Sequence, residues 1–131
     1  MRSSPTRTPV QVFGVVDSQA TRAAERWFRE RRLAIHLVDL RRRPIAPGEL
    51  RRFVDRFGAR ALADTEGRAW REAGLGYVAL GDEELVRRLL DDQRLLRLPL
   101  VRCGSALAIG RDEASWKAVA EAATSAAGAL R

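Results

Sequence analysis

The chain has 131 residues, 46% of them hydrophobic, and carries a net charge of +7. That length and apolar content suit one globular domain, and no apolar run approaches the roughly 18 residues that a membrane span needs. A single cysteine and a single histidine exclude a disulfide framework and a cluster of metal ligands. The basic charge permits contact with an acidic partner, but the aromatic residues are not interleaved with arginines, so direct nucleic-acid binding is not expected.

The first third of the chain predicts a strand-helix-strand unit. Residues 1–9 lack the apolar stretch of a secretory signal and predict a flexible tail, so a cytoplasmic location is expected. Residues 10–16 form an apolar run typical of a buried strand, and apolar residues then recur at helical spacing as far as Phe28. Residues 34–40 are again short, apolar and β-branched, which predicts a second strand parallel to the first.

Residues from 41 to about 97 have a helical pattern. Pro47 suits the first position of a helix that Gly58 closes, and Asp82 is expected to cap a second helix. Between them the sequence predicts two short helices broken at Gly67. The apolar faces expected for the two longer helices are Leu50, Phe53, Val54 and Phe57, and Leu85, Val86, Leu89 and Leu90.

The last third predicts a hairpin followed by a helix. Residues 98–102 and 106–109 read as strands joined by a tight turn near Cys103 and Gly104, and Asp112 is expected to cap the final helix. The chain therefore predicts an α/β protein in the order β-α-β, helical insertion, β-β-α, with a mixed four-stranded sheet. The apolar face expected for the last helix is Trp116, Val119, Ala120 and Ala123.

This order of elements is that of a thioredoxin-like fold with a helical insertion. Three segments, "VFGVVDSQATRAAERWF", "VDLRRRPIAPGELRRFV" and "LLRLPLVRCG", resemble the arsenate reductase (ArsC) family, which includes the Spx-type transcription regulators. The resemblance runs from about Val10 to Trp116. It implies one thioredoxin-like domain over residues 10–131, with its insertion at about residues 41–97, and a cis peptide bond before Pro99.

In this resemblance Ser18 stands where the family has its catalytic cysteine, and Thr21 and Arg22 follow in register. A serine hydroxyl titrates far above neutrality and becomes a nucleophile only beside a positioned base. The one histidine, His36, has no carboxylate partner evident in the sequence. Ser18 is therefore expected to cap a helix, and an active arsenate reductase is not expected.

The anion-binding arginines of the family are only partly matched. Asp64 stands in the insertion where the family has an arginine, and Leu98 takes another arginine position, with Arg97 one residue earlier. A third position corresponds to Gly110, beside Arg111. No metal is expected, and glutathione is the one cofactor that the resemblance suggests. The candidate ligand-binding residues are Ser18, Thr21, Arg22, Arg97 and Pro99.

Other conspicuous side chains are expected to be structural. Cys103 lies four strand residues beyond Pro99, roughly 13 Å away, so it is too far to react at Ser18. His36 is expected to be a structural or surface residue of a strand, and residues 41–43 a solvated connection. The three tryptophans, Trp27, Trp70 and Trp116, are expected to pack.

The resemblance leaves three functions open. The first is a binding or interaction module that has lost redox activity, with a small anion, a thiol such as glutathione, or a protein partner as its ligand. The second is a glutathione- or glutaredoxin-linked oxidoreductase similar to arsenate reductase. The third is an Spx-type regulator with RNA polymerase as its partner. The basic charge favours this third class, although Ser18 and Thr21 occupy the two positions of its redox-sensing cysteine pair.

Overall fold

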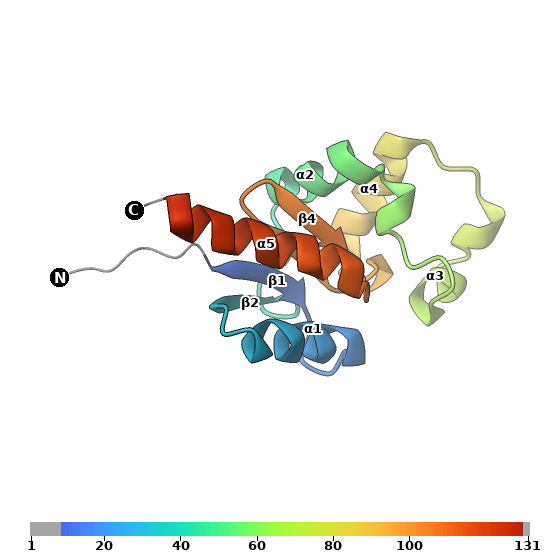
Figure 1. Ribbon diagram of the computed structural model, residues 1–131. Coiled ribbons are helices and arrows are strands. Elements are labelled where there is room, and N and C mark those ends of the chain that lie inside the picture. The colour runs from blue at the N-terminus through green and yellow to red at the C-terminus, as the bar shows by residue number, and fades with distance from the viewer. Residues whose placement is uncertain (1–8, 130–131) are drawn as a thin grey trace. The chain divides into compact units, whose positions relative to one another are not determined.

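A computed structural model describes residues 9–129, with side chains as far as Ser125 (Figure 1). The predicted tail over residues 1–9 lies, apart from Pro9, outside the described residues. The chain divides into two compact units. Of the described residues, those up to Arg41 and those from Leu98 onward form the sheet unit, and Arg42–Arg97 form the helical unit. That residues 10–131 fold as one domain stays a prediction. No helix in the described part of the chain has the length and apolar character to cross a membrane.

The sheet unit contains a mixed four-stranded sheet, as predicted. The strand order is β2-β1-β3-β4, in which β1 is parallel to β2 and antiparallel to β3, and β3 is antiparallel to β4. Its elements in chain order are β1 (Val10–Gly14), α1 (Gln19–Glu30), β2 (Ile35–Asp39), β3 (Leu100–Cys103), β4 (Ala106–Ile109) and α5 (Glu113–Ala129).

The strand register places the start of α1 at one end of the sheet. Gly14 pairs with Asp39 of β2, and Phe13 pairs with Leu100 of β3. The last residues of β1 and β2 and the first residue of β3 therefore lie at the same end. Since α1 begins at Gln19, five residues after Gly14, its N-terminus lies at this end of the sheet as well.

The core of the sheet unit lies between the sheet and both α1 and α5. Alternate strand residues point to one face, which these two helices cover. Trp116 of α5 is the largest fully buried side chain, and its ring centroid lies 6.2 Å from that of Phe28 and 5.9 Å from that of Trp27. The main core residues are Val10, Val12, Ala24, Phe28, Val101, Cys103, Ala108, Trp116 and Val119.

The helical unit is built from short helices, as the sequence predicts. Pro47 is the first residue of α2, and Gly58 ends that helix with a φ of 85° that favours glycine. Gly67 is the N-cap of α3, so it separates two short helices as predicted. The elements are α2 (Pro47–Phe57), the 3-10 helix η1 (Arg60–Leu62), α3 (Arg68–Glu72), the 3-10 helix η2 (Leu75–Tyr77), α4 (Asp82–Asp91) and the 3-10 helix η3 (Gln93–Leu95).

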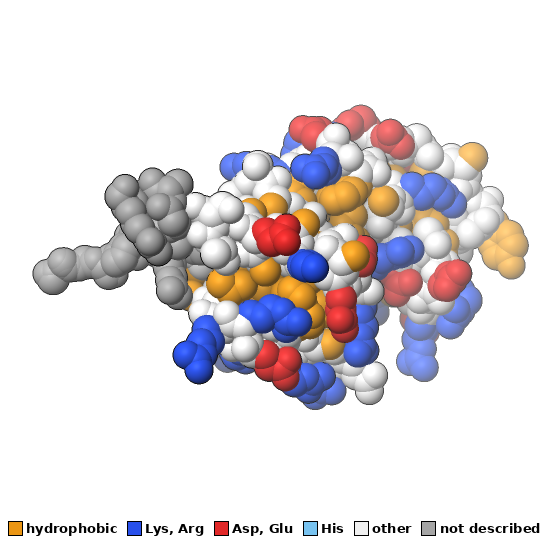
Figure 2. Space-filling model, viewed as in Figure 1, with side chains coloured by type: hydrophobic (Ala, Val, Ile, Leu, Met, Phe, Trp, Pro, Cys, Tyr) orange, Lys and Arg blue, Asp and Glu red, His pale blue; other side chains and the backbone are white. Residues whose placement is uncertain are grey.

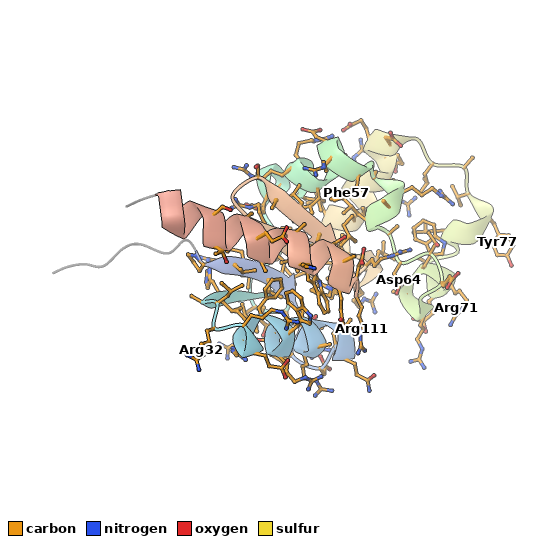
Figure 3. All side chains as sticks on the ribbon, viewed as in Figure 1. Arg32, Phe57, Asp64, Arg71, Tyr77 and Arg111 are labelled. Atoms are coloured by element: carbon orange, nitrogen blue, oxygen red, sulfur yellow. The ribbon has the colours of Figure 1, made fainter. Side chains whose placement is uncertain are left out.

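Several details differ from the sequence prediction. Strand β1 stops at Gly14, and Val16 is 51% exposed in the following turn. Phe57, the last residue of α2, is 38% exposed rather than part of the buried face (Figure 3). The prediction that Asp82 caps α4 is wrong, because Gly81 is the N-cap and Asp82 is the first of three acidic residues that favour the helix dipole. Strand β3 begins only after Pro99, which has no N–H for the ladder.

Candidate functional site

Ser18 is the N-cap of α1, as predicted. Its backbone is extended, with φ −80° and ψ 123°, and its Oγ accepts a hydrogen bond from the N–H of Thr21 at 3.1 Å. Its carbonyl oxygen accepts from the N–H of Arg22 at 3.0 Å. The hydroxyl therefore satisfies a backbone donor that the helix itself leaves unpaired.

No general base accompanies Ser18 among residues 9–125. The N–H of Thr21 is the one hydrogen-bond partner of the hydroxyl within these residues. His36 lies on β2 with an exposed side chain, as predicted, and makes no hydrogen bond to Ser18. A serine without a base is not activated for nucleophilic attack.

Thr21 joins the start of α1 to the end of β1. Its side chain is fully buried, and its Oγ1 has no hydrogen-bond partner. A Cβ placed on Gly14 would lie 2.7 Å from Cγ2 of Thr21, closer than real Cβ atoms approach other atoms. The absence of a side chain at Gly14 therefore allows the helix to pack this closely against the strand.

Pro99 lies at the same end of the sheet. The Leu98–Pro99 bond is cis, as predicted, and the carbonyl oxygen of Pro99 accepts from the N–H of Gly110 at 2.8 Å. Pro99 directly precedes Leu100, and Gly14 directly follows Phe13. Phe13 and Leu100 are paired across β1 and β3. Gly14 and Pro99 are therefore the residues that follow the last pair of this register, at the same end of the sheet.

Four of the five predicted ligand-binding residues lie at the same end of the sheet in the sheet unit: Ser18, Thr21, Arg22 and Pro99. Arg97 is the last residue of the helical unit. Its N–H donates to the carbonyl oxygen of Leu62 at 2.7 Å, and its side chain is exposed. That any of the five binds a ligand stays a prediction.

An ion pair beside Ser18 was not predicted from the sequence. Arg41 binds the Asp17 carboxylate, with Nη2 and Oδ2 2.8 Å apart. The pKa of Asp17 is lowered, mainly by this hydrogen bond from Arg41 and to a smaller degree by the charge of Arg22. The ends of two parallel strands meet at one edge, so the positions after β1 and after β2 could have suggested the pairing.

One positive charge lies unpaired beside the start of α1, and the Asp39 carboxylate at the end of β2 lies at the same end of the sheet. Arg22 is exposed, and its guanidinium makes no hydrogen bond or ion pair with the described side chains. Asp17 is neutralised by Arg41, so the charge of Arg22 is left over. The helix N-terminus adds a partial positive charge, and the arrangement therefore suits an anion or a hydrogen-bond acceptor.

Cys103 lies at the other end of β3, away from Ser18. It is 3% exposed, faces the core with Val10 and Trp116, and pairs with Ala106 across the hairpin. Burial raises the pKa of its thiol, and the charge of Arg102 offsets this in part. A buried thiol with a raised pKa is a poor nucleophile.

We therefore expect the Cys103 thiol to react slowly with alkylating reagents. At pH 8 the rate of modification by iodoacetamide in the folded protein should be at least about tenfold below that of the denatured chain, because both burial and a raised pKa reduce the accessible thiolate. Mass spectrometry of timed samples measures both rates. Equal rates would show that the thiol is exposed in solution.

The remaining positions of the family's anion-binding set lie in different places. Asp64 is half-buried in the helical unit, where its N–H donates to the carbonyl oxygen of Leu95 at 2.8 Å. Arg111 is exposed after β4 (Figure 3). Within the described residues, no group of three His, Cys, Asp or Glu side chains is arranged to hold a metal ion.

Comparison with solved structures identifies the fold. The arsenate reductase from Vibrio cholerae superposes with a TM-score of 0.76 at 18% identity, covering 87% of this chain and 99% of that one. An arsenate reductase (ArsC) related protein from Brucella melitensis gives 0.65 at 16% identity, covering 88% and 97%. The YFFB protein gives 0.76 at 18% identity, covering 84% and 97%. At these identities the likeness shows the fold alone, which is thioredoxin-like.

The sequence itself gives a family match. No curated protein matches the chain. Residues 13–119, which extend from β1 to the middle of α5, match the ArsC family. Because this match covers well over half of the sequence, the chain belongs to the ArsC family.

Proposed function

We propose that this chain is a non-redox binding module of the ArsC family, which uses the start of α1 to bind an anionic group or a hydrogen-bond acceptor. One observation carries the proposal: the Ser18 hydroxyl caps α1 through the N–H of Thr21. The resemblance assigns this position to the catalytic cysteine, so the start of the helix holds a hydroxyl in place of a thiol.

The loss of redox chemistry follows from the properties of the two side chains. Reduction through a thiol needs a thiolate that attacks and then forms a disulfide, and the Ser18 hydroxyl does neither. The one thiol of the chain, Cys103, is buried with a raised pKa. The proposal therefore excludes arsenate reduction and glutaredoxin-linked turnover by this protein.

Binding of an anion is supported by the groups that remain at this end of α1. The first N–H groups of a helix have no acceptor within it, and Ser18 satisfies only that of Thr21. The exposed Arg22 adds a full positive charge beside these groups. Suitable ligands are phosphate, the carboxylates of glutathione, or a carboxylate on a partner protein. Arg97 is a further candidate contact.

Titration of the 15N-labelled protein with phosphate and with glutathione tests the proposal. We expect amide shifts centred on residues 18–22, and we expect Arg22→Ala to remove them because its charge contributes to binding. Arg26→Ala is the matched control, since Arg26 is also exposed on α1 and lies one turn farther along. Its spectra should shift like those of the wild type.

Comparing the two ligands also distinguishes a general anion site from a site that is specific for glutathione. Shifts with phosphate and glutathione alike indicate a general anion site, whereas shifts with glutathione alone indicate recognition of the tripeptide. No shift at about 10 mM of either ligand, well above a millimolar Kd, would overturn the proposal. Equal shifts in wild type and Arg22→Ala would also overturn it.

A further inference from the structure

A second candidate site lies between the C-terminal half of α1 and α5. The two helices border a surface groove of about 370 Å³. Figure 2 shows hydrophobic side chains exposed along this strip between the helices. The volume falls in the range of small-molecule sites, about 300–1,000 Å³. The residues used below are Trp27, Arg31, Leu33, Lys117, Ala120 and Glu121.

The floor of the groove is apolar and rests on the core. Trp27, Leu33 and Ala120 are partly buried and pack against the core cluster of the sheet unit. The Trp27 ring lies 5.9 Å from that of Trp116, which is fully buried. A floor anchored in this way is already formed without a ligand, which lowers the entropic cost of binding.

Two positive charges lie beside this floor, one from each helix. The Arg31 guanidinium stacks 3.6 Å above the centroid of the Trp27 ring, and its Nη1 donates to the carbonyl oxygen of Trp27 at 2.9 Å. These contacts hold Arg31 in place. Lys117 projects from α5. Neither cation pairs with a carboxylate among residues 9–125, whereas Arg29, also on α1, is paired with Glu25.

We propose that this groove binds an apolar carboxylic acid. The hydrocarbon part packs on Leu33 and Ala120 beside the stacked Trp27 and Arg31, and the carboxylate lies between Arg31 and Lys117. One acidic side chain, Glu121, also lines the groove, so the lining residues carry a net charge of one positive unit.

The groove is independent of the site at Ser18. Ser18 caps the start of α1 and Arg31 caps its end. Trp27, the first groove residue along α1, is nine positions beyond Ser18, which at 1.5 Å of rise per residue is about 13 Å along the helix. Binding in the groove therefore neither requires nor tests an anion at the start of α1.

The experiment compares 3-phenylpropionate with 3-phenylpropan-1-ol, which has the same hydrocarbon body without the charge. For a ligand of about eleven non-hydrogen atoms we expect a millimolar Kd for the carboxylate. The readout is the NMR signal of the Trp27 indole N–H, together with the amides of residues 117–121. The alcohol should bind about fivefold more weakly, as expected for one partly exposed ion pair.

Two variants assign the charge effect. Lys117→Gln and Arg31→Gln should each weaken 3-phenylpropionate about fivefold. Lys117→Gln should leave the alcohol unchanged, because only the carboxylate contacts its ammonium group. Arg29→Gln, an exposed change on α1 outside the groove, should leave both ligands unchanged. Equal binding of acid and alcohol, an unaltered affinity in both variants, or no shift at about 20 mM would each overturn the proposal.

Discussion

Replacing Gly14 by alanine should lower the free energy of unfolding by about 1–3 kcal/mol, the usual cost of overpacking a core. The new Cβ would lie 2.7 Å from Cγ2 of Thr21 and 3.0 Å from its Cβ. Thr21 is fully buried and β-branched, so it has no alternative rotamer in open space. Either the side chain or the start of α1 has to move. Chemical denaturation followed by circular dichroism measures the loss.

The cause can be separated from a general glycine effect. Gly48, near the start of α2, has no atom within 4 Å of an added Cβ, so Gly48→Ala should be neutral or stabilising by up to about 1 kcal/mol. The double variant Gly14→Ala with Thr21→Ala should lose less unfolding free energy than the two single variants lose together. Truncating Thr21 provides the space that the added methyl group needs. Additive costs would contradict the close contact.

Much of this fold could be predicted from local patterns. The apolar runs predicted β1 and β2, and Pro47 and Gly58 predicted the two ends of α2. Asp112 predicted the start of α5, and its Oδ2 accepts a hydrogen bond from the Ser115 hydroxyl at 2.7 Å. Such signals are local, because a cap or a turn acts within a few residues. The prediction that Asp82 is an N-cap was wrong because aspartate is favoured both at the N-cap and in the first turn of a helix. Sequence alone does not distinguish these two positions.

The candidate site was less predictable, because its contacts join distant segments. Asp17 and Arg41 are 24 residues apart, and their pairing depends on the parallel register of β1 and β2. Gly14 lies in the first of the three segments that resemble the family. Its role was not predictable, because it comes from the depth at which Thr21 packs. The exposure of Tyr77 on η2 was not predictable either. Its side chain is 97% exposed, whereas an aromatic residue is usually expected to be buried (Figure 3).

Replacing Ser18 by cysteine should create a thiol with a pKa below the value of about 8.5 for free cysteine. The start of α1 carries a partial positive charge, and the exposed Arg22 follows one turn later. Asp17 opposes this effect only weakly, because Arg41 neutralises it. The measurement uses Ser18→Cys in a Cys103→Ser background, so that one thiol is present. Its thiolate absorbance near 240 nm is followed against pH.

A second set of variants identifies the cause of a lowered pKa. Removing the guanidinium by Arg22→Ala should raise the pKa of the new thiol, whereas Arg26→Ala should leave it unchanged. A thiol that titrates like free cysteine would mean that the helix start and Arg22 no longer stabilise an anion. That outcome would also remove the electrostatic support for the proposed binding module.

The same thiol makes stability depend on pH, with a defined sign. If the pKa is lower in the folded protein than in the unfolded chain, the unfolded chain binds more protons between the two values. The stability of the cysteine variant relative to Ser18→Ala should then rise with pH from the folded pKa to about 8.5, by about 1.4 kcal/mol for each unit of difference, and stay constant above. Below the folded pKa this contribution is absent, because the thiol is protonated in both the folded and the unfolded chain. A stability difference that does not change with pH would show that the thiolate gains nothing from the start of α1, in contradiction to the lowered pKa.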